Sequence, residues 1–363
     1  MGQAGERVYW PIIKVTDNWC NMKCRYCFYN ELDQQSRHVM SESMLEKLIS
    51  QTLHLATGRI RFVWHGGEPL LAGLGFYHKA IGFQKKYAKD SHTIENAIQT
   101  NGTLVDEQWA EFFKEYDFTV GISIDGPPSI HDVNRVFPSG KPSSRAVMAG
   151  VSHLHKYKVP LGALVTLTKG AADSITDILD YLYHDVKIRS VGYCPFLENG
   201  NSELYDSSLS AQELASVYSK SHQWLDSIND ANFRIQDLDC LAAGVLGVMA
   251  GLCSYNGGCR FFFCANSDGT IYPCDSLSTD EKWKLGDLNV MTLKEILTGG
   301  VRRKFCEWAE KVPKKCAECD WYEACRAGCP AYRDEQHHYK FCESRMIAFQ
   351  EVEDWLWNAF VDT

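Results

Sequence analysis

The most informative segment of the sequence is Trp19-Cys20-Asn21-Met22-Lys23-Cys24-Arg25-Tyr26-Cys27-Phe28-Tyr29, in which three cysteines have the spacing Cys-x3-Cys-x2-Cys. Three thiolates on one short loop can hold three irons of a cubane iron-sulfur cluster, whose usual full set is four cysteines. The fourth iron would stay open, and an open coordination position separates a catalytic metal site from a structural one. The spacing therefore predicts a catalytic cluster on Cys20, Cys24 and Cys27. A structural zinc site completed by His38 or a remote cysteine is the alternative.

Around this loop, from Ile12 to about Cys194, the chain alternates short apolar runs with amphipathic stretches, which is typical of βα units around a parallel sheet. Strands are predicted at Ile12 to Thr16, Ile60 to Trp64, Thr93 to Gln99, Phe118 to Ile124, Leu161 to Thr168 and Ile188 to Tyr193. Helices are predicted at Glu42 to Ala56, Phe76 to Tyr87, Asp106 to Glu115, Ser144 to Tyr157 and Ala172 to His184, with Ser41 and Asp106 as N-caps. Chemistry in parallel α/β folds gathers at the carboxyl ends of the strands, so we expect the polar motifs that follow the strands to meet there.

The alternation stops after Asn199, which predicts a domain boundary. The predicted divisions are a barrel over 1–199, a helical bridge over 200–252 with a helix from Ala211 to Ile228, and a cysteine-rich domain over 253–363. Asp268-Gly269 predicts a type I′ hairpin turn between the apolar runs 261–263 and 270–272. A final amphipathic helix is predicted from Glu343 to Phe360.

Composition narrows the classes of partner. The formal net charge of -9 offers no basic face for phosphates, which argues against nucleic acid and anionic membranes. Neither a signal peptide nor a run of about eighteen apolar residues is present, so the sequence predicts a cytoplasmic protein with no membrane partner. In a reducing compartment, fifteen cysteines are better explained by metal ligation than by disulfides.

A second group of cysteines lies in the C-terminal part, and its members are Cys253, Cys259, Cys274, Cys316, Cys319, Cys325, Cys329 and Cys342. Eight thiolates are enough for two fully ligated 4Fe-4S clusters, although the spacings 316–319 and 325–329 would also suit a pair of zinc sites. Four cysteines are left over, and their roles stay open: Cys194, Cys240, Cys264 and Cys306. Cys194 follows the sixth predicted strand, where an inert core thiol is favoured and a thiol that faces the cavity is the alternative. Cys264 is also a possible substitute for Cys259 as a ligand.

The first cysteine motif, with Tyr26 before its last cysteine, resembles the radical S-adenosylmethionine (SAM) superfamily. That resemblance implies a partial (β/α)6 barrel of the TIM type, and a cluster whose open iron binds SAM and cleaves it to a hydrogen-abstracting radical. It also implies SAM contacts from the motifs that follow the next strands, namely Gly66, Gly67, Glu68, Asn101, Ser123, Asp125 and Arg135. Caps, turns and surface ion pairs are the alternative roles for Asn101, Asp125 and Arg135.

The second group resembles the SPASM extension of peptide-modifying radical SAM enzymes, including Gly269-x4-Cys274 and the turn Tyr272-Pro-Cys-Asp275. The resemblance implies two auxiliary 4Fe-4S clusters, one on Cys253, Cys259, Cys274 and Cys329 and the other on Cys316, Cys319, Cys325 and Cys342, which makes three clusters in all. A cluster with no free iron is better suited to accepting electrons than to binding substrate, so the predicted reaction is oxidative. Asp275 is the expected base, with internal bonding to loop amides as the alternative.

The resemblance covers the chain from about Ile12 to Phe349, and it is closest to anaerobic sulfatase-maturing enzymes and to maturases of ribosomal peptides. His65, where sulfatase maturases usually carry Gln, favours a maturase that crosslinks a ribosomally made peptide. Formation of formylglycine from Cys or Ser in a sulfatase is the alternative, and a binding protein without catalysis is the alternative of another class. Tyr29 and His65 are expected near the substrate, with bonding inside the strand end as the second account of His65.

The implied partners are a peptide or protein substrate and an electron donor such as flavodoxin or ferredoxin. The sequence starts without the N-terminal extension with which many peptide maturases bind a leader peptide. Recognition is therefore expected at the barrel mouth, at the helical bridge or on a separate leader-binding protein.

Overall fold

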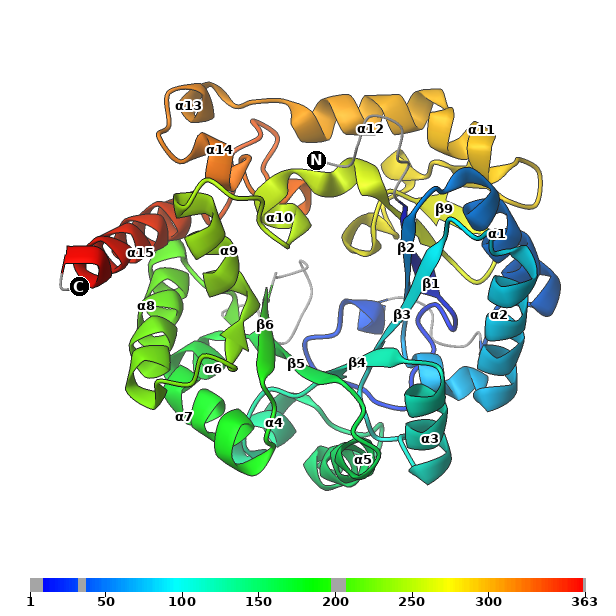
Figure 1. Ribbon diagram of the computed structural model, residues 1–363, viewed down its shortest axis with the longest axis horizontal. Helices are drawn as coiled ribbons and strands as arrows, with labels where there is room; N and C mark the ends of the chain where they lie inside the picture. The colour runs from blue at the N-terminus through cyan, green and yellow to red at the C-terminus, as the bar shows by residue number, and fades with distance from the viewer. Residues whose placement is uncertain (1–8, 32–36, 197–206, 362–363) are drawn as a thin grey trace.

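The computed structural model describes residues 9–31, 37–196 and 207–361, which build one curved, open sheet of ten strands (Figure 1). The strand order is β10-β9-β8-β1-β2-β3-β4-β5-β6-β7, and the first six strands along the chain are parallel. These six are β1 (Trp10–Lys14), β2 (Arg59–His65), β3 (Thr93–Thr100), β4 (Phe118–Ser123), β5 (Leu161–Leu167) and β6 (Ser190–Pro195). The two edge strands, β10 and β7, do not pair with each other, so the predicted partial barrel is confirmed.

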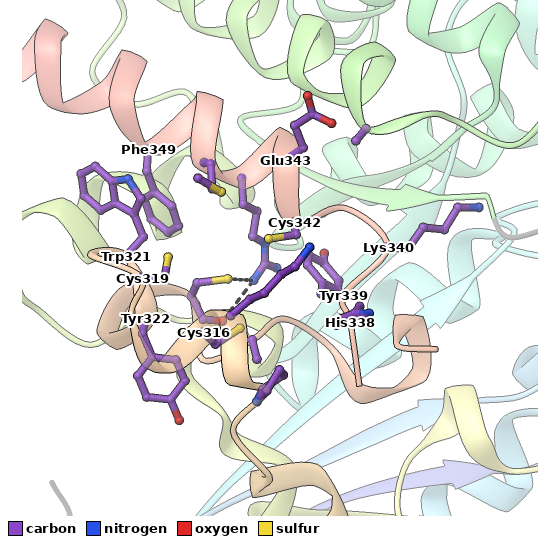
Figure 2. Close-up of a pocket in the computed structure, with 17 residues that line it drawn as sticks. Cys316, Cys319, Trp321, Tyr322, His338, Tyr339, Lys340, Cys342, Glu343 and Phe349 are labelled. Atoms are coloured by element: carbon purple, nitrogen blue, oxygen red, sulfur yellow. Dashed lines mark hydrogen bonds between the residues drawn. The ribbon is translucent and has the colours of Figure 1, made fainter. Parts of the chain in front are cut away.

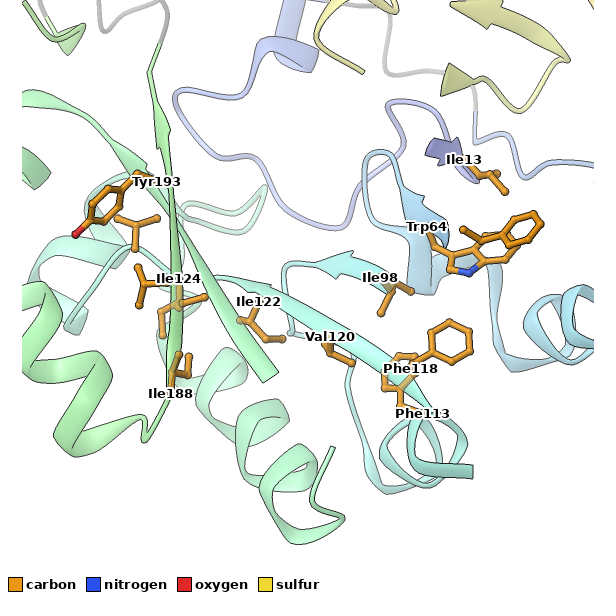
Figure 3. Close-up of a cluster of buried hydrophobic side chains, with 14 of the residues drawn as sticks. Ile13, Trp64, Ile98, Phe113, Phe118, Val120, Ile122, Ile124, Ile188 and Tyr193 are labelled. Carbon is orange, nitrogen blue, oxygen red and sulfur yellow. The ribbon is translucent and has the colours of Figure 1, made fainter. Parts of the chain in front are cut away.

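Each of the six predicted strands is present with small shifts at its ends, and side chains alternate between two faces as the pleat requires. In β2, Ile60, Phe62 and Trp64 are buried in the layer between the strands and the outer helices. Figure 3 shows this layer, with Trp64, Val120 and Phe118 from the strands beside Phe113 of a helix. The alternation turns the last residue of β2, His65, toward the interior of the barrel.

The outer helices are α1 (Glu42–Leu55), α2 (Leu74–Tyr87), α3 (Glu107–Glu115), α4 (Pro128–Asn134) and α5 (Ser144–Lys156). Two of them, α1 and α3, begin at the predicted caps. The side chain of Ser41 accepts a hydrogen bond from the backbone N–H of Met44, and that of Asp106 accepts from Trp109. Both predicted N-caps are therefore confirmed.

The single helix predicted from Ala172 to His184 is wrong. The segment forms α6 (Lys169–Asp173), α7 (Ile175–Asp180) and a π-helical turn at Tyr181–Asp185. Ser174 leaves helical geometry between the first two pieces, with φ -105° and ψ 22°. Ile175, Ile178 and Leu182 are nevertheless buried, because all the pieces follow the same sheet surface. The apolar pattern predicted which residues are buried, but it did not predict the break at Ser174.

The C-terminal region extends the same sheet, which the sequence did not predict. β8 (Phe262–Ala265) runs parallel to β1, and β9 (Thr270–Tyr272) and β10 (Gly286–Asp287) follow as antiparallel neighbours. The predicted hairpin is confirmed, but its type I′ turn is wrong. Such a turn needs positive φ at two central residues, and in the connection 266–269 only Gly269 has it, at 95°. The Asn266 N–H donates to the Thr270 carbonyl at 2.9 Å, which leaves three residues, 267–269, between the paired ends.

The remaining elements are α8 (Ala211–Ile228), β7 (Arg234–Ile235), α9 (Gln236–Val245), α10 (Cys253–Asn256), α11 (Leu293–Thr298), α12 (Gly300–Glu310), α13 (Lys314–Ala317), α14 (Tyr322–Cys325) and α15 (Cys342–Val361). The predicted helices at Ala211 to Ile228 and at the C-terminus are confirmed. α11 packs on α1 while α15 packs on α8 and α9, so the C-terminal region spans the two ends of the open sheet (Figure 1).

The predicted boundary at Asn199 lies outside the described residues, and the division into three domains stays a prediction. Among the helices of the described ranges, none is both long and apolar enough to cross a membrane.

Candidate active site and cysteine clusters

The three cysteines of the first motif lie together in the loop after β1. Burial, with smaller contributions from Glu68 and the other two thiols, raises the pKa of the Cys20 thiol to about 12. Burial also raises the pKa of Cys24 to about 11 and that of Cys27, although Arg135 opposes the shift at Cys24. Their mutual influence shows that the thiols are neighbours, and a metal that binds them has to displace their protons.

The glycines after β2 bring a second loop against this one. A Cβ on Gly67 would lie 2.2 Å from the carbonyl oxygen of Trp19, and Gly66 has a φ of 111°. The Glu68 N–H donates to the same Trp19 carbonyl at 2.9 Å. Only glycine permits this approach of two backbones, so the Gly-Gly pair positions the cysteine loop. The expected contact of these glycines with SAM stays a prediction.

Glu68 joins the ends of β2 and β3. Its carboxylate is fully buried, and it accepts hydrogen bonds from the Leu70 N–H at 3.0 Å, the Thr100 hydroxyl at 2.7 Å and the Asn101 N–H at 2.8 Å. Burial raises the pKa of Glu68 to about 7 despite these donors. The Asn101 side chain in turn lies 3.7 Å from the Cys20 sulfur. The expected SAM contacts of Glu68 and Asn101 stay predictions, because the structure gives Glu68 three internal partners.

Asp125 and Arg135 form a buried ion pair, with 3.0 Å between Arg135 Nε and Asp125 Oδ2. The same carboxylate accepts from the Tyr26 hydroxyl at 2.5 Å and from the Thr166 N–H at 3.0 Å. Arg135 lies 5.3 Å from the centre of the Tyr26 ring. The alternative of a surface ion pair is therefore wrong, and the pair instead holds the cysteine loop to β4 and β5. Ser123, at the end of β4, accepts from Gln99 at 2.9 Å.

Asp275, Tyr29 and His65, which the sequence analysis expected at the site of the chemistry, lie together at the barrel mouth. Lys14, which the sequence did not suggest, lies with them. Lys14 and His65 are cross-strand partners of β1 and β2. The Lys14 ammonium lies 3.1 Å from Asp275 Oδ1 and 4.7 Å from the centre of the Tyr29 ring, and His65 Nδ1 lies 3.8 Å from the same Asp275 oxygen. Lys14 is 2% exposed, whereas the Asp275 side chain is 23% exposed although its Oδ1 atom is buried, so the carboxyl group is only partly open.

The charges at the mouth keep Asp275 ionised. Burial would raise the pKa of this carboxyl group, but the Lys14 ammonium and then His65 hold it below its ordinary value. Asp275 and Lys14 both influence the pKa of Cys27, so the mouth adjoins the first cysteine motif. Lys14 was missed because a lysine near a strand end carries no motif. The only available signal was its place in the first predicted strand, shortly before the cysteine loop.

Cys194 also faces the barrel interior. It lies near the end of β6, where burial raises its pKa to about 11 and where the charges of Arg135, Asp275 and Asp125 all reach it. Its surroundings therefore favour the alternative in which Cys194 faces the cavity over that of an inert core thiol.

The first predicted auxiliary set lies together although its members are far apart in sequence. The pKa of Cys274 is raised well above its ordinary value by burial and then by Cys329, Cys259 and Cys253. Burial and the neighbouring thiols likewise raise the pKa of Cys259 to about 12. The fold therefore brings together the four thiols that the resemblance implied.

The second predicted set lines a cavity of about 300 Å³ in the C-terminal region (Figure 2). All four of its cysteines, Cys316, Cys319, Cys325 and Cys342, contribute to the wall. Burial raises the pKa of Cys316, and Cys342, Cys325 and Cys319 raise it further. The wall also includes Trp321 and Phe349, whose rings stack 5.1 Å apart.

The remaining cysteines belong to neither set. Cys264 is fully buried in β8, where Lys14, Asp275 and Asp17 act on it rather than other thiols, so its substitution for Cys259 is not supported. Cys240 is buried in α9, and Cys306 packs within α12 beside Arg302. In the described part of the chain, no group of three or more His, Cys, Asp or Glu side chains converges on a point where a single metal ion could bind. A cubane cluster does not require such convergence, because each of its cysteines binds a different iron.

Comparisons with known proteins agree with this geometry. A model of the radical SAM superfamily matches residues 15–182, and the SPASM iron-sulfur cluster-binding domain matches residues 259–320. The chain is 34% identical over 334 residues to a cysteine-type anaerobic sulfatase-maturating enzyme of Clostridium perfringens, covering 90% of each chain. It is 33% identical over 344 residues to a serine-type enzyme of Bacteroides thetaiotaomicron, covering 89% of this chain and 82% of the relative. The solved structure of native anSMEcpe with bound AdoMet and Cp18Cys peptide has a TM-score of 0.86 and 30% identity, with 98% of this chain and 100% of that chain covered.

Proposed function

Because the chain belongs to the radical SAM and SPASM family of anaerobic sulfatase-maturating enzymes, we propose that it oxidises a cysteine or serine of a sulfatase to formylglycine. The radical SAM enzyme class is common to both functions considered from the sequence. The sulfatase-maturating relatives support formylglycine formation over the crosslinking of a ribosomal peptide, which rested on His65. The observation that carries the proposal is the meeting of Asp275, Lys14, Tyr29 and His65 beside the three-cysteine loop.

The donor sets fit the proposed cofactors, three 4Fe-4S clusters and SAM. Cys20, Cys24 and Cys27 would hold the first cluster, and the two groups of four thiols would hold the auxiliary clusters. Bound at the open iron, SAM would supply the radical that removes a hydrogen atom from the substrate. Its pocket would be lined by Gly66, Gly67, Glu68, Asn101, Ser123, Asp125 and Arg135, which surround the three-cysteine loop.

Asp275 is the proposed base, and Lys14 holds its carboxylate ionised and oriented. Oxidation of the side chain removes a hydrogen atom from the β-carbon, a proton from the thiol or hydroxyl group, and one electron, and it leaves a carbon–sulfur or carbon–oxygen double bond. Asp275 takes the proton at its carboxylate, whose side chain is 23% exposed although Oδ1 is buried. Serine gives the aldehyde directly, whereas the thioaldehyde from cysteine gives it after water displaces sulfide.

The position of Asp275 also brings the proposed proton acceptor close to the proposed electron acceptor. It directly follows Cys274, a thiol of the first auxiliary set, so an acceptor for the electron lies one residue from the acceptor for the proton. Tyr29 and His65 line the same mouth, where they would orient the substrate side chain. Flavodoxin or ferredoxin is the proposed source of the electron that starts each turnover.

The test uses anaerobically reconstituted protein, SAM, a reductant and sulfatase-derived peptides with Cys or Ser at the modified position. An aldehyde, captured with a hydrazide and located by mass spectrometry, is expected together with 5′-deoxyadenosine. Cys24→Ala is the control and should form neither product. Loss of two hydrogens from a sulfur-free residue pair of a precursor peptide, with no aldehyde from any sulfatase peptide, would instead support crosslinking.

A further inference from the structure

Arg345 is a buried cation at the start of the C-terminal helix. It lies in the first turn of α15, one turn beyond Cys342, and is 3% exposed. Its guanidinium Nη1 donates to the Ser254 carbonyl at 2.7 Å and to the Cys325 carbonyl at 3.3 Å, and it lies 3.5 Å from the Cys325 sulfur. One side chain therefore contacts backbone next to Cys253 of one thiol set and a sulfur of the other.

Two tyrosines enclose this guanidinium. Its central carbon lies 3.7 Å from the centre of the Tyr255 ring and 4.7 Å from that of Tyr339. Its Nε atom is buried without a hydrogen-bond partner. The rings stabilise a cation through their faces, and they also exclude water from it.

Arg345 has no carboxylate partner in the described residues, whereas a buried cation normally requires one. Asp237 is close enough for Arg345 to lower its pKa, but the two form no ion pair. The negative charge nearest to Arg345 is therefore expected from thiolates. Arg345 influences the pKa of Cys253, Cys329 and Cys342, which belong to both sets.

We propose that Arg345 is a positioning residue that raises the reduction potential of the auxiliary cluster held by Cys316, Cys319, Cys325 and Cys342, which makes this cluster the downstream acceptor of the substrate electron. This inference rests on the proposed cluster set. A cation beside a ligating sulfur stabilises the reduced form, which carries one more negative charge than the oxidised form. With both clusters in place, one electron would leave the substrate radical, pass the cluster of Cys274 and be accepted by the cluster beside Arg345, from which oxidised flavodoxin or ferredoxin would remove it.

The test measures reduction potentials by EPR-monitored titration without substrate, in a background that carries Cys20→Ala, Cys24→Ala and Cys27→Ala. Arg345→Met should shift the one-electron equilibrium at least tenfold toward the oxidised form, which is about 59 mV. The affected signal should be the one that changes in Cys342→Ala. Arg345→Lys, which keeps the charge, should recover more than half of the shift.

The matched control is Arg189→Met. Arg189 stacks 4.4 Å from the Tyr183 ring centre and donates to backbone carbonyls, but it lies on the barrel surface. Its removal should leave both auxiliary potentials unchanged. Equal potentials in Arg345→Met and in the parent, at equal iron content, would overturn the proposal even if the enzyme makes formylglycine. A shifted potential without any aldehyde product would retain it while the proposed function failed.

A second measurement needs no substitution at Arg345. In protein labelled with 15N-arginine, pulsed EPR of the reduced cluster should detect a nitrogen coupling from a guanidinium beside the Cys325 sulfur. If Arg345→Met does not load iron, this measurement alone decides the matter, and the absence of the coupling would contradict the proposal.

Discussion

Lys14 shows how one buried charge prepares the barrel mouth for chemistry. Its ammonium contacts Asp275 and donates to the Ser278 hydroxyl, while Phe28 and Tyr29 cover it. Burial acts to lower the pKa of Lys14, but the Asp275 charge and then Cys264 raise it, so the lysine stays charged. A lysine thus fixes the charge and direction of a carboxylate from another part of the chain.

We expect Lys14→Met to separate SAM cleavage from product formation. Without the ammonium, Asp275 loses its closest cation, so proton removal from the substrate should slow while hydrogen abstraction persists. The ratio of modified peptide to 5′-deoxyadenosine should fall more than tenfold when both are measured in one assay. Lys79→Met removes a lysine that pairs with Glu42 on the surface, and it should leave this ratio unchanged. An unchanged ratio in Lys14→Met would contradict the role given to Lys14.

His131 is a second residue whose charge state matters. It is fully buried, its Nδ1 accepts from the Asp125 N–H at 3.3 Å, and its Nε2 lies 3.0 Å from the Ser143 hydroxyl. This arrangement suits the neutral ring, and burial together with Arg135 lowers the pKa of His131 to about 4. If Nδ1 were protonated, its N–H would face the Asp125 N–H, and neither donor would have an acceptor there.

The lowered pKa makes stability sensitive to acid. Between the unfolded value of about 6.5 and the folded value of about 4, the unfolded state binds more protons, so stability falls as pH falls. The contribution is fully present above about pH 6.5, and roughly 2 kcal/mol of it should be lost by about pH 5. The difference in unfolding free energy between the wild type and His131→Gln should shrink by that amount over this range. A difference that stays constant with pH would show that His131 does not titrate in this way.

At the scale of elements, the loops after β1 and β2 position the first cysteine motif together. The sequence predicted both loops, because cysteine spacing and a Gly-Gly pair are visible in one dimension. The contact between the two loops could not be predicted, because it is made by backbone groups, which do not depend on residue type. The break between α6 and α7 and the form of the β8–β9 turn were missed for a related reason: local geometry at Ser174 and Gly269 depends on neighbours in space.

We expect Gly67→Ala to impair the first cluster. The added Cβ would meet the Trp19 backbone at 2.2 Å, and backbone atoms cannot move aside as a flexible side chain can. Iron bound by the N-terminal motif, measured where the auxiliary cysteines are replaced, should fall several-fold, and 5′-deoxyadenosine formation should fall with it. Gly75→Ala is the matched control, because a Cβ there meets no atom within 4 Å. Normal iron content in Gly67→Ala would contradict this account of the loop.

At the scale of the whole molecule, the C-terminal region is joined to the barrel through the sheet itself. β8 pairs with β1, so Asp275 and the auxiliary cysteines are held at a fixed place relative to the first motif. The two cysteine sets interleave in sequence, and only the family resemblance could assign them in advance. The fold groups the thiols in the same way, because distant segments converge there.

Matched cysteine substitutions test this grouping. Cys259→Ala should remove one of three proposed clusters and therefore about a third of the bound iron. Cys264→Ala replaces a buried thiol five residues later in the chain, outside both sets, and it should retain full iron. Iron and sulfide analysis of both reconstituted variants provides the measurement. Loss of iron in Cys264→Ala with retention in Cys259→Ala would reverse the assignment.

The amino-acid order alone determined the parallel barrel, most helices and the cysteine inventory, because periodic burial and motif spacing are local properties of the chain. The pairing of Lys14 with Asp275, the continuation of the sheet through β8 and the contacts of Arg345 with the Cys325 sulfur and the Ser254 carbonyl depended on the tertiary structure. Each joins residues that are distant in sequence, and such contacts form only when packing of the core brings their strands and helices together.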